Sequence, residues 1–183
     1  MNLMTEEEEE EEVILVDEND KPIGTMPKLA AHLAGKFHRA FSVFVFNSAG
    51  ELLLQQRAAD KYHSAGKWTN TCCSHPRPGE LTADAANRRL QEEMGMECEL
   101  SPVFSFSYTA ELENGLIENE YDHVYFGSTD TLPVPNPEEV AAFQYISMEA
   151  LEHRLQQDPT AYTEWLKICF DQVMEHKKNR IKF

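Results

Sequence analysis

The stretch from Trp68 to Gly95 constrains the fold of this chain more than any other. Its first half places two thiols and an imidazole within four residues, at Cys72, Cys73 and His75. Its second half has the composition of a helix, with Thr82 as the expected N-cap and a glycine suited to the left-handed C-terminal position. A short extended segment must therefore lead into a helix that carries carboxylates. Thiol, imidazole and carboxylate groups at such a junction suggest a metal-assisted site.

The expected helix also carries two arginine–glutamate pairs. Arg88 and Glu92, like Arg89 and Glu93, are four residues apart and so lie on one helix face. A purely structural interpretation remains open here, because solvated pairs of this kind contribute only about 0.2–0.5 kcal/mol each. The cysteines could likewise be small buried apolar residues.

Composition limits the classes of function. A length of 183 residues indicates one domain, and we expect it to span residues 13–183 after an acidic, disordered tail at residues 1–12. The formal net charge of −16 argues against a nucleic-acid partner, and no apolar run is long enough to cross a membrane. Four cysteines without a C-x-x-C pair argue against a zinc ribbon. A reducing, cytoplasmic setting is the expectation, while the oligomeric state stays open.

Strand and helix patterns alternate along the chain and place it in the α/β (α+β) class. Strands are expected at residues 13–16, 39–46, 51–56, 103–110, 117–126 and 140–146. The pair at 39–46 and 51–56 should form a central hairpin. Besides the helix that ends at Gly95, helices are expected at 28–34, at 148–157 with Ser147 as its cap, and at 161–176 with Thr160 as its cap.

Charged residues gather in two further places. Glu118 and Glu120 alternate along one expected strand, so both carboxylates face one side, and Asp122 extends the row. Such a row is costly unless water or a cation compensates it, and an exposed acidic strand face is the alternative. The loop from 58 to 67, together with Arg57, forms a basic cluster, for which a solvated loop is the simpler interpretation.

The order of strands and the helix with paired glutamates resemble the Nudix fold, whose box reads G-x5-E-x7-R-E-U-x-E-E-x-G-U. The residues in register with the box are Glu80, Arg88, Leu90, Glu92, Glu93, Gly95 and Met96. Two positions depart from it, because Ser74 replaces the first glycine and Arg89 replaces a glutamate that binds metal in many Nudix hydrolases. The resemblance implies an α/β/α sandwich with a mixed sheet.

A more specific resemblance accounts for both departures. The chain is similar to the type I isopentenyl-diphosphate isomerase family through AAH at 30–32, FH at 37–38, WTNTCCSHP at 68–76 and ENEY at 118–121. This similarity implies conversion of isopentenyl to dimethylallyl diphosphate, with a small homoallylic or allylic diphosphate as substrate.

The resemblance also implies two metal sites. The implied ligands of a divalent transition metal, Mn²⁺ or Zn²⁺, are His32, His38, His75, Glu118 and Glu120. Three imidazoles and a carboxylate pair on one strand face suit such an ion. A Mg²⁺ ion would bridge Glu93 to the diphosphate. The implied diphosphate contacts are Lys28, Arg57, Lys61 and Arg89.

Proton transfer would fall to Cys73 and Glu120, with Tyr108 as a hydrogen-bonding neighbour. Trp165 would place its ring against the developing positive charge. Adjacent strand residues face opposite ways, so we expect Cys72 to be structural and not paired with Cys73. Which group acts as acid and which as base stays open. The competing interpretations are a Nudix pyrophosphohydrolase and a non-catalytic Nudix binding module.

Overall fold

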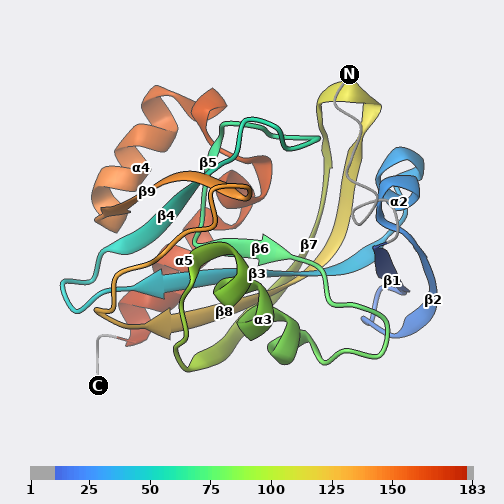
Figure 1. The fold of residues 1–183 in the computed structure, drawn as a ribbon, viewed down its shortest axis with the longest axis horizontal. Coiled ribbons are helices and arrows are strands. Elements are labelled where there is room, and N and C mark those ends of the chain that lie inside the picture. The colour runs from blue at the N-terminus through green and yellow to red at the C-terminus, as the bar shows by residue number, and fades with distance from the viewer. Residues whose placement is uncertain (1–10, 181–183) are drawn as a thin grey trace.

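The computed structural model describes residues 11–180 and folds them into one mixed sheet with helices on both faces (Figure 1). The strands are β1 (Glu12–Val16), β2 (Pro22–Pro27), β3 (His38–Phe46), β4 (Leu52–Arg57), β5 (Trp68–Thr69), β6 (Cys72–Ser74), β7 (Leu100–Glu111), β8 (Ile117–Ser128) and β9 (Val140–Ile146). The helices are α2 (Lys28–Ala34), α3 (Thr82–Met94), α4 (Met148–Gln157) and α5 (Glu164–Arg180). Short 3-10 turns lie at Glu113–Gly115 and Pro159–Ala161. The predicted α/β (α+β) class with a mixed sheet is confirmed.

Strand β3 lies at the centre and is buried on both faces. Phe41, Val43 and Val45 face one core, which α3 covers. Phe44 and Phe46 face the other core, which α4 and α5 cover. Because neighbouring strand residues point to opposite faces, this single apolar strand contributes side chains to the cores on both faces of the sheet.

The pairing of β3 explains how the sheet opens to form a site. On one side β3 runs parallel to β8, while on the other side it meets β1, β6 and β4 in turn. The predicted hairpin is only partly correct, since β3 and β4 share the single pair Phe46–Leu52 and then separate. Thr71 lies in the gap, where its hydroxyl accepts from the Val45 amide at 2.9 Å and donates to the Leu53 carbonyl at 2.6 Å. These bonds join the residue before β6 to both strands, and β6 itself pairs with β3.

Glycines end the first two helices as predicted. Gly35 (φ 61°) follows α2 and Gly95 (φ 60°) follows α3, both in the left-handed conformation. The expected cap at Thr82 is wrong, because the cap position is Leu81 and no side chain caps the helix. The Glu80 N–H donates a hydrogen bond to the carbonyl of residue 77 and closes a turn. Leu81 after this turn is extended, and Thr82 is already the first residue of the helix.

The two C-terminal helices differ in how well their starts were predicted. Ser147 caps α4 as expected, accepting from the amide of residue 150 at 3.2 Å. The expected cap at Thr160 is wrong, and α5 begins only at Glu164. Its start is delayed because the Thr163 amide donates to the Trp68 carbonyl at 3.0 Å, which docks this segment on β5. A contact distant in the sequence therefore sets the helix boundary.

The first described residues already pair with the neighbouring strand. Glu12 is the first residue of β1 and pairs with Pro27, and the Glu11 carbonyl accepts from the Lys28 amide at 2.8 Å. Backbone pairing therefore includes the last two residues of the segment expected to be an acidic tail. The rest of the expected acidic tail lies outside the described residues. Within residues 11–180, no helix is long and apolar enough to cross a membrane.

Candidate active site

A pocket lies where α2, β6, β8 and the loop after β4 meet. The residues implied to act in catalysis, substrate binding or metal binding line it, except His32 and His38, which are fully buried. Of the basic loop cluster, Arg57 and Lys61 line the pocket, whereas Lys67 is not among the lining residues. The tertiary structure thus brings together groups from α2, β3, the end of β4 and its loop, β6, α3, β7, β8 and α5.

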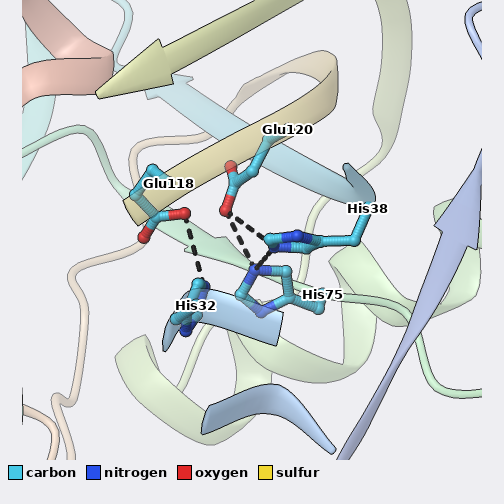
Figure 2. Close-up of side chains that lie close together, drawn as sticks. All are labelled: His32, His38, His75, Glu118 and Glu120. Atoms are coloured by element: carbon cyan, nitrogen blue, oxygen red, sulfur yellow. Dashed lines mark hydrogen bonds and ion pairs between the residues drawn. The ribbon is translucent and has the colours of Figure 1, made fainter. Parts of the chain in front are cut away.

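Five side chains converge at one end of this pocket, and we name them the His–Glu cluster (Figure 2). They are His32 of α2, His38 of β3, His75 after β6, and Glu118 and Glu120 of β8. One nitrogen or oxygen atom from each lies within 4.8 Å of those of the others, and all five residues are buried. Parallel pairing contributes directly, since His38 stands opposite Glu120 in the register of β3 and β8.

The spacing within the cluster fits a coordinated ion. His75 Nε2 lies 3.0 Å from Glu120 Oε1 and 3.2 Å from His38 Nε2. Neighbouring ligands about 2.1 Å from an octahedral ion lie about 3 Å apart. The Nε2 atom of His32 and the Oε2 atom of Glu118 are 3.4 Å apart, and both are buried without a hydrogen-bond partner. An ion between these groups would satisfy them.

The tautomer of His38 points the same way. Its Nδ1–H donates to the Lys36 carbonyl at 2.7 Å, so in the neutral ring the Nε2 lone pair faces the Glu120 carboxylate 3.4 Å away. Without an ion this contact needs a second proton. Burial lowers the pKa of His38, yet Glu120 outweighs burial and raises the pKa. A divalent cation would take the place of that proton, and a backbone carbonyl that orients the ring is a common feature of histidine ligands.

The charge states of the cluster suit metal ligands. Burial lowers the pKa of His75, and His38 lowers it further, which favours the neutral imidazole that binds metals. Burial alone would raise the pKa of Glu120, but contacts with Glu118 and His38 outweigh it and bring that pKa to about 2. Asp122, next in the row, behaves in the opposite way, because burial and the charge of Glu120 raise its pKa.

The two adjacent cysteines face opposite ways, as predicted. Cys72 is fully buried in the core beneath α3, whereas Cys73 lines the pocket, and neither forms a disulfide. Burial raises the pKa of the Cys73 thiol, which is therefore protonated near neutral pH. In the same pocket the Tyr108 hydroxyl donates to Glu120 Oε2 at 2.9 Å.

Four cations, which we name the basic rim, occupy the rest of the pocket: Lys28, Arg57, Lys61 and Arg89. Three of them are paired with carboxylates, through Lys28–Glu11 (3.5 Å), Lys61–Glu139, Arg89–Glu93 (2.6 Å) and Arg89–Glu139 (3.4 Å). Within residues 11–180, Arg57 has no carboxylate at ion-pair distance. Its guanidinium instead lies 5.5 Å from the centre of the Trp165 ring and donates to the carbonyl of residue 63 at 3.2 Å.

Sequence reasoning missed several residues that line or support this pocket. Tyr62 contacts His32 Nδ1 at 2.6 Å, His63 Nε2 lies 3.4 Å from Glu118 Oε1, and Gln55 donates to Glu93 Oε2 at 2.8 Å. No helix or strand periodicity links these residues to the groups that they contact. Tyr62 and His63 do lie in the basic loop from 58 to 67, and the charge of this loop was the one feature of the sequence that could have pointed to them.

Comparison with known proteins decides the family. The chain is 53% identical over 164 residues to the isopentenyl-diphosphate Delta-isomerase of Pectobacterium atrosepticum, covering 90% of this chain and 92% of that protein. It is 57% identical over 162 residues to isopentenyl-diphosphate Delta-isomerase 1 of Aromatoleum aromaticum, covering 88% and 92%. The chain belongs to the isopentenyl-diphosphate Delta-isomerase family. The predicted family resemblance is confirmed.

This isomerase-family chain also carries the predicted Nudix fold. The NUDIX domain model matches residues 36–166. A crystal structure of a protein from Deinococcus radiodurans superposes with a TM-score of 0.75 at 22% identity, covering 88% of this chain and 98% of that one. At 22% identity this similarity concerns the fold alone. The reaction must therefore be inferred from the isomerase relatives and from the site.

Proposed function

We propose that this protein converts isopentenyl diphosphate to dimethylallyl diphosphate as a step of isoprenoid biosynthesis. One observation carries the proposal: a thiol and a carboxylate, Cys73 and Glu120, share a pocket with the His–Glu cluster and the basic rim. The relatives at about half identity carry the name of this activity. The four unpaired cysteines support a cytoplasmic setting.

The reaction moves a double bond by adding a proton to one carbon and removing a proton from another. We assign these two transfers to Cys73 and Glu120, with Tyr108 holding Glu120 through its hydroxyl. Glu120, Tyr108 and Trp165 are buried around the proposed reaction centre, which would limit the access of water to a carbocation-like intermediate. Trp165 lines this pocket and offers an aromatic ring to the developing positive charge.

The His–Glu cluster would hold the divalent transition metal, Mn²⁺ or Zn²⁺. Orphaned polar atoms and ligand spacing within it support this assignment. When bound, the ion supplies positive charge that neutralises the buried carboxylates and fixes the orientation of Glu120.

The basic rim would bind the diphosphate group by charge-assisted hydrogen bonds. Glu93 lines the same part of the pocket, where Gln55 and Arg89 hold its two oxygens, and we assign it to a Mg²⁺ ion that accompanies the diphosphate. The hydrolase alternative is disfavoured because Arg89 stands where the Nudix box has a metal-binding glutamate. A non-catalytic module would not need Cys73 and Glu120 together in a buried pocket.

Purified protein incubated with isopentenyl diphosphate, Mg²⁺ and Mn²⁺ should form dimethylallyl diphosphate. Cys73→Ser should lower turnover by about 10²- to 10⁴-fold, because a hydroxyl is far less acidic than a thiol. Cys72→Ser is the matched control, since its side chain lies in the core beneath α3 and should affect stability more than turnover.

Near-normal turnover in Cys73→Ser with loss in Cys72→Ser would move the chemistry to the other thiol. Release of inorganic phosphate by the parent protein, without an isomerised product, would favour the hydrolase instead.

A further inference from the structure

His63 is a fourth buried histidine beside the His–Glu cluster. Its Nε2 atom lies 3.4 Å from Glu118 Oε1, and the residue is 5% exposed. The other oxygen of the same carboxylate, Oε2, lies 3.4 Å from His32 Nε2. Glu118 is therefore held between two imidazoles, one inside the cluster and one outside it.

The ring of His63 is fixed by its surroundings. It packs edge to face against Tyr62, with ring centres 4.6 Å apart, and against Trp165, with ring centres 6.0 Å apart. Its backbone carbonyl accepts from Arg57 at 3.2 Å. The next residue, Ser64, has a positive φ of 50°, a conformation that costs free energy for a residue other than glycine. A hydrogen bond from the Ser64 backbone N–H to the Glu113 carboxylate keeps the loop in this conformation.

The surroundings of His63 allow a different tautomer from that of His38. At His38 a carbonyl takes the Nδ1 proton and leaves Nε2 as a lone pair for an ion. At His63 the Nδ1 neighbour is the Ser64 hydroxyl, 3.3 Å away, which can donate a proton to the ring. Nε2 of His63 can then carry the ring proton and present it to the Glu118 carboxylate, which only accepts.

We propose that His63 is a positioning residue that holds Glu118 Oε1, so that Oε2 faces the metal of the His–Glu cluster. This inference rests on the metal site of the proposed function. Loss of such an outer hydrogen-bonding partner typically lowers metal affinity by about 10- to 100-fold. The same histidine contacts Trp165 and Arg57, so it connects the metal end of the pocket to the substrate end.

The test compares two variants. His63→Phe keeps a ring against Tyr62 and Trp165 but removes the N–H group, whereas His63→Gln keeps an N–H donor on a shorter side chain. The affinities of the metal-free proteins for Mn²⁺ and Zn²⁺ are measured by competition with a chelator, without substrate. We expect about 10- to 100-fold weaker binding in His63→Phe and recovery of most of that loss in His63→Gln.

His123→Leu is the matched control, because it removes a histidine of β8 that bonds Asp20 at 2.8 Å, away from the cluster. It should leave metal affinity unchanged. Thermal melting of the metal-free proteins reports folding, and His63→Leu replaces His63→Phe if the latter does not fold.

Parental affinity in His63→Phe would overturn the inference. Equal loss in His63→Phe and His63→Gln would also overturn it, since that pattern indicates a direct ligand. Because metal binding is measured without turnover, a parent protein that binds metal but does not isomerise the diphosphate contradicts only the proposed function.

Discussion

The two ends of the pocket satisfy their charges in different ways. In the His–Glu cluster, His32 Nε2 and Glu118 Oε2 are buried without a hydrogen-bond partner. In the basic rim, three of the four cations already pair with carboxylates of the protein. The cluster therefore leaves polar atoms that an added ion would satisfy, whereas most of the rim already pairs with carboxylates of the protein.

This difference has an energetic consequence. An ion that enters the cluster relieves buried groups whose isolation costs about 1–3 kcal/mol each. A diphosphate that enters the rim must instead replace Glu11 and Glu139 as the partner of Lys28, Lys61 and Arg89. Arg57 is the exception among the described residues, because its charge faces no carboxylate. We expect tight metal binding at one end and exchange of ionic partners at the other.

Removing one imidazole from the cluster should have the largest effect. His75→Asn deletes an Nε2 atom that lies 3.0 Å from Glu120 Oε1. We expect metal affinity to fall by at least about 100-fold, more than for an outer-shell partner, and turnover to fall with it. Equilibrium dialysis followed by metal analysis measures the first, and His123→Asn is the control. Full occupancy and activity in His75→Asn would remove this residue from the ligand set.

We expect the KM for substrate to rise more when the basic rim loses its unpaired cation than when it loses a paired one. Arg57→Gln should raise KM by about 10- to 100-fold, since a charge-assisted hydrogen bond contributes about 1.5–3 kcal/mol. Lys61→Gln should raise KM less, because substrate must first displace Glu139 from this lysine. Bound transition metal should stay at the parental level in both variants. Equal increases in KM would show that the pairing with Glu139 does not compete with substrate.

The smallest effect is expected from the competing carboxylate itself. Glu139→Gln frees Lys61 and one contact of Arg89 while keeping the size of the side chain. Partly exposed ion pairs contribute about 0–1 kcal/mol, so KM should fall by no more than about fivefold. Steady-state kinetics with isopentenyl diphosphate measures it, and Glu138→Gln on the neighbouring exposed residue is the control. A higher KM in Glu139→Gln would indicate that this carboxylate helps to bind substrate.

Local patterns were sufficient for most elements of the fold. The period-two alternation of Glu118 and Glu120 indicated a shared face, and the structure places both on the buried side of β8. Glycines at 35 and 95 ended their helices because the left-handed conformation is a property of the residue itself. The start of α5 was missed because docking of Thr163 on Trp68 overrides the local preference of Thr160 for a cap.

The sequence by itself therefore determined the elements, the faces of their strands, and the family through its motifs. Only the tertiary structure showed which charges meet, including Glu11 with Lys28, Glu139 with Lys61 and His63 with Glu118. The partners in these pairs lie between 17 and 78 residues apart in the sequence. The period of a helix or strand cannot relate such positions. The distance between them in space depends on how β3 and β4 separate and on how the loop after β4 packs against β8.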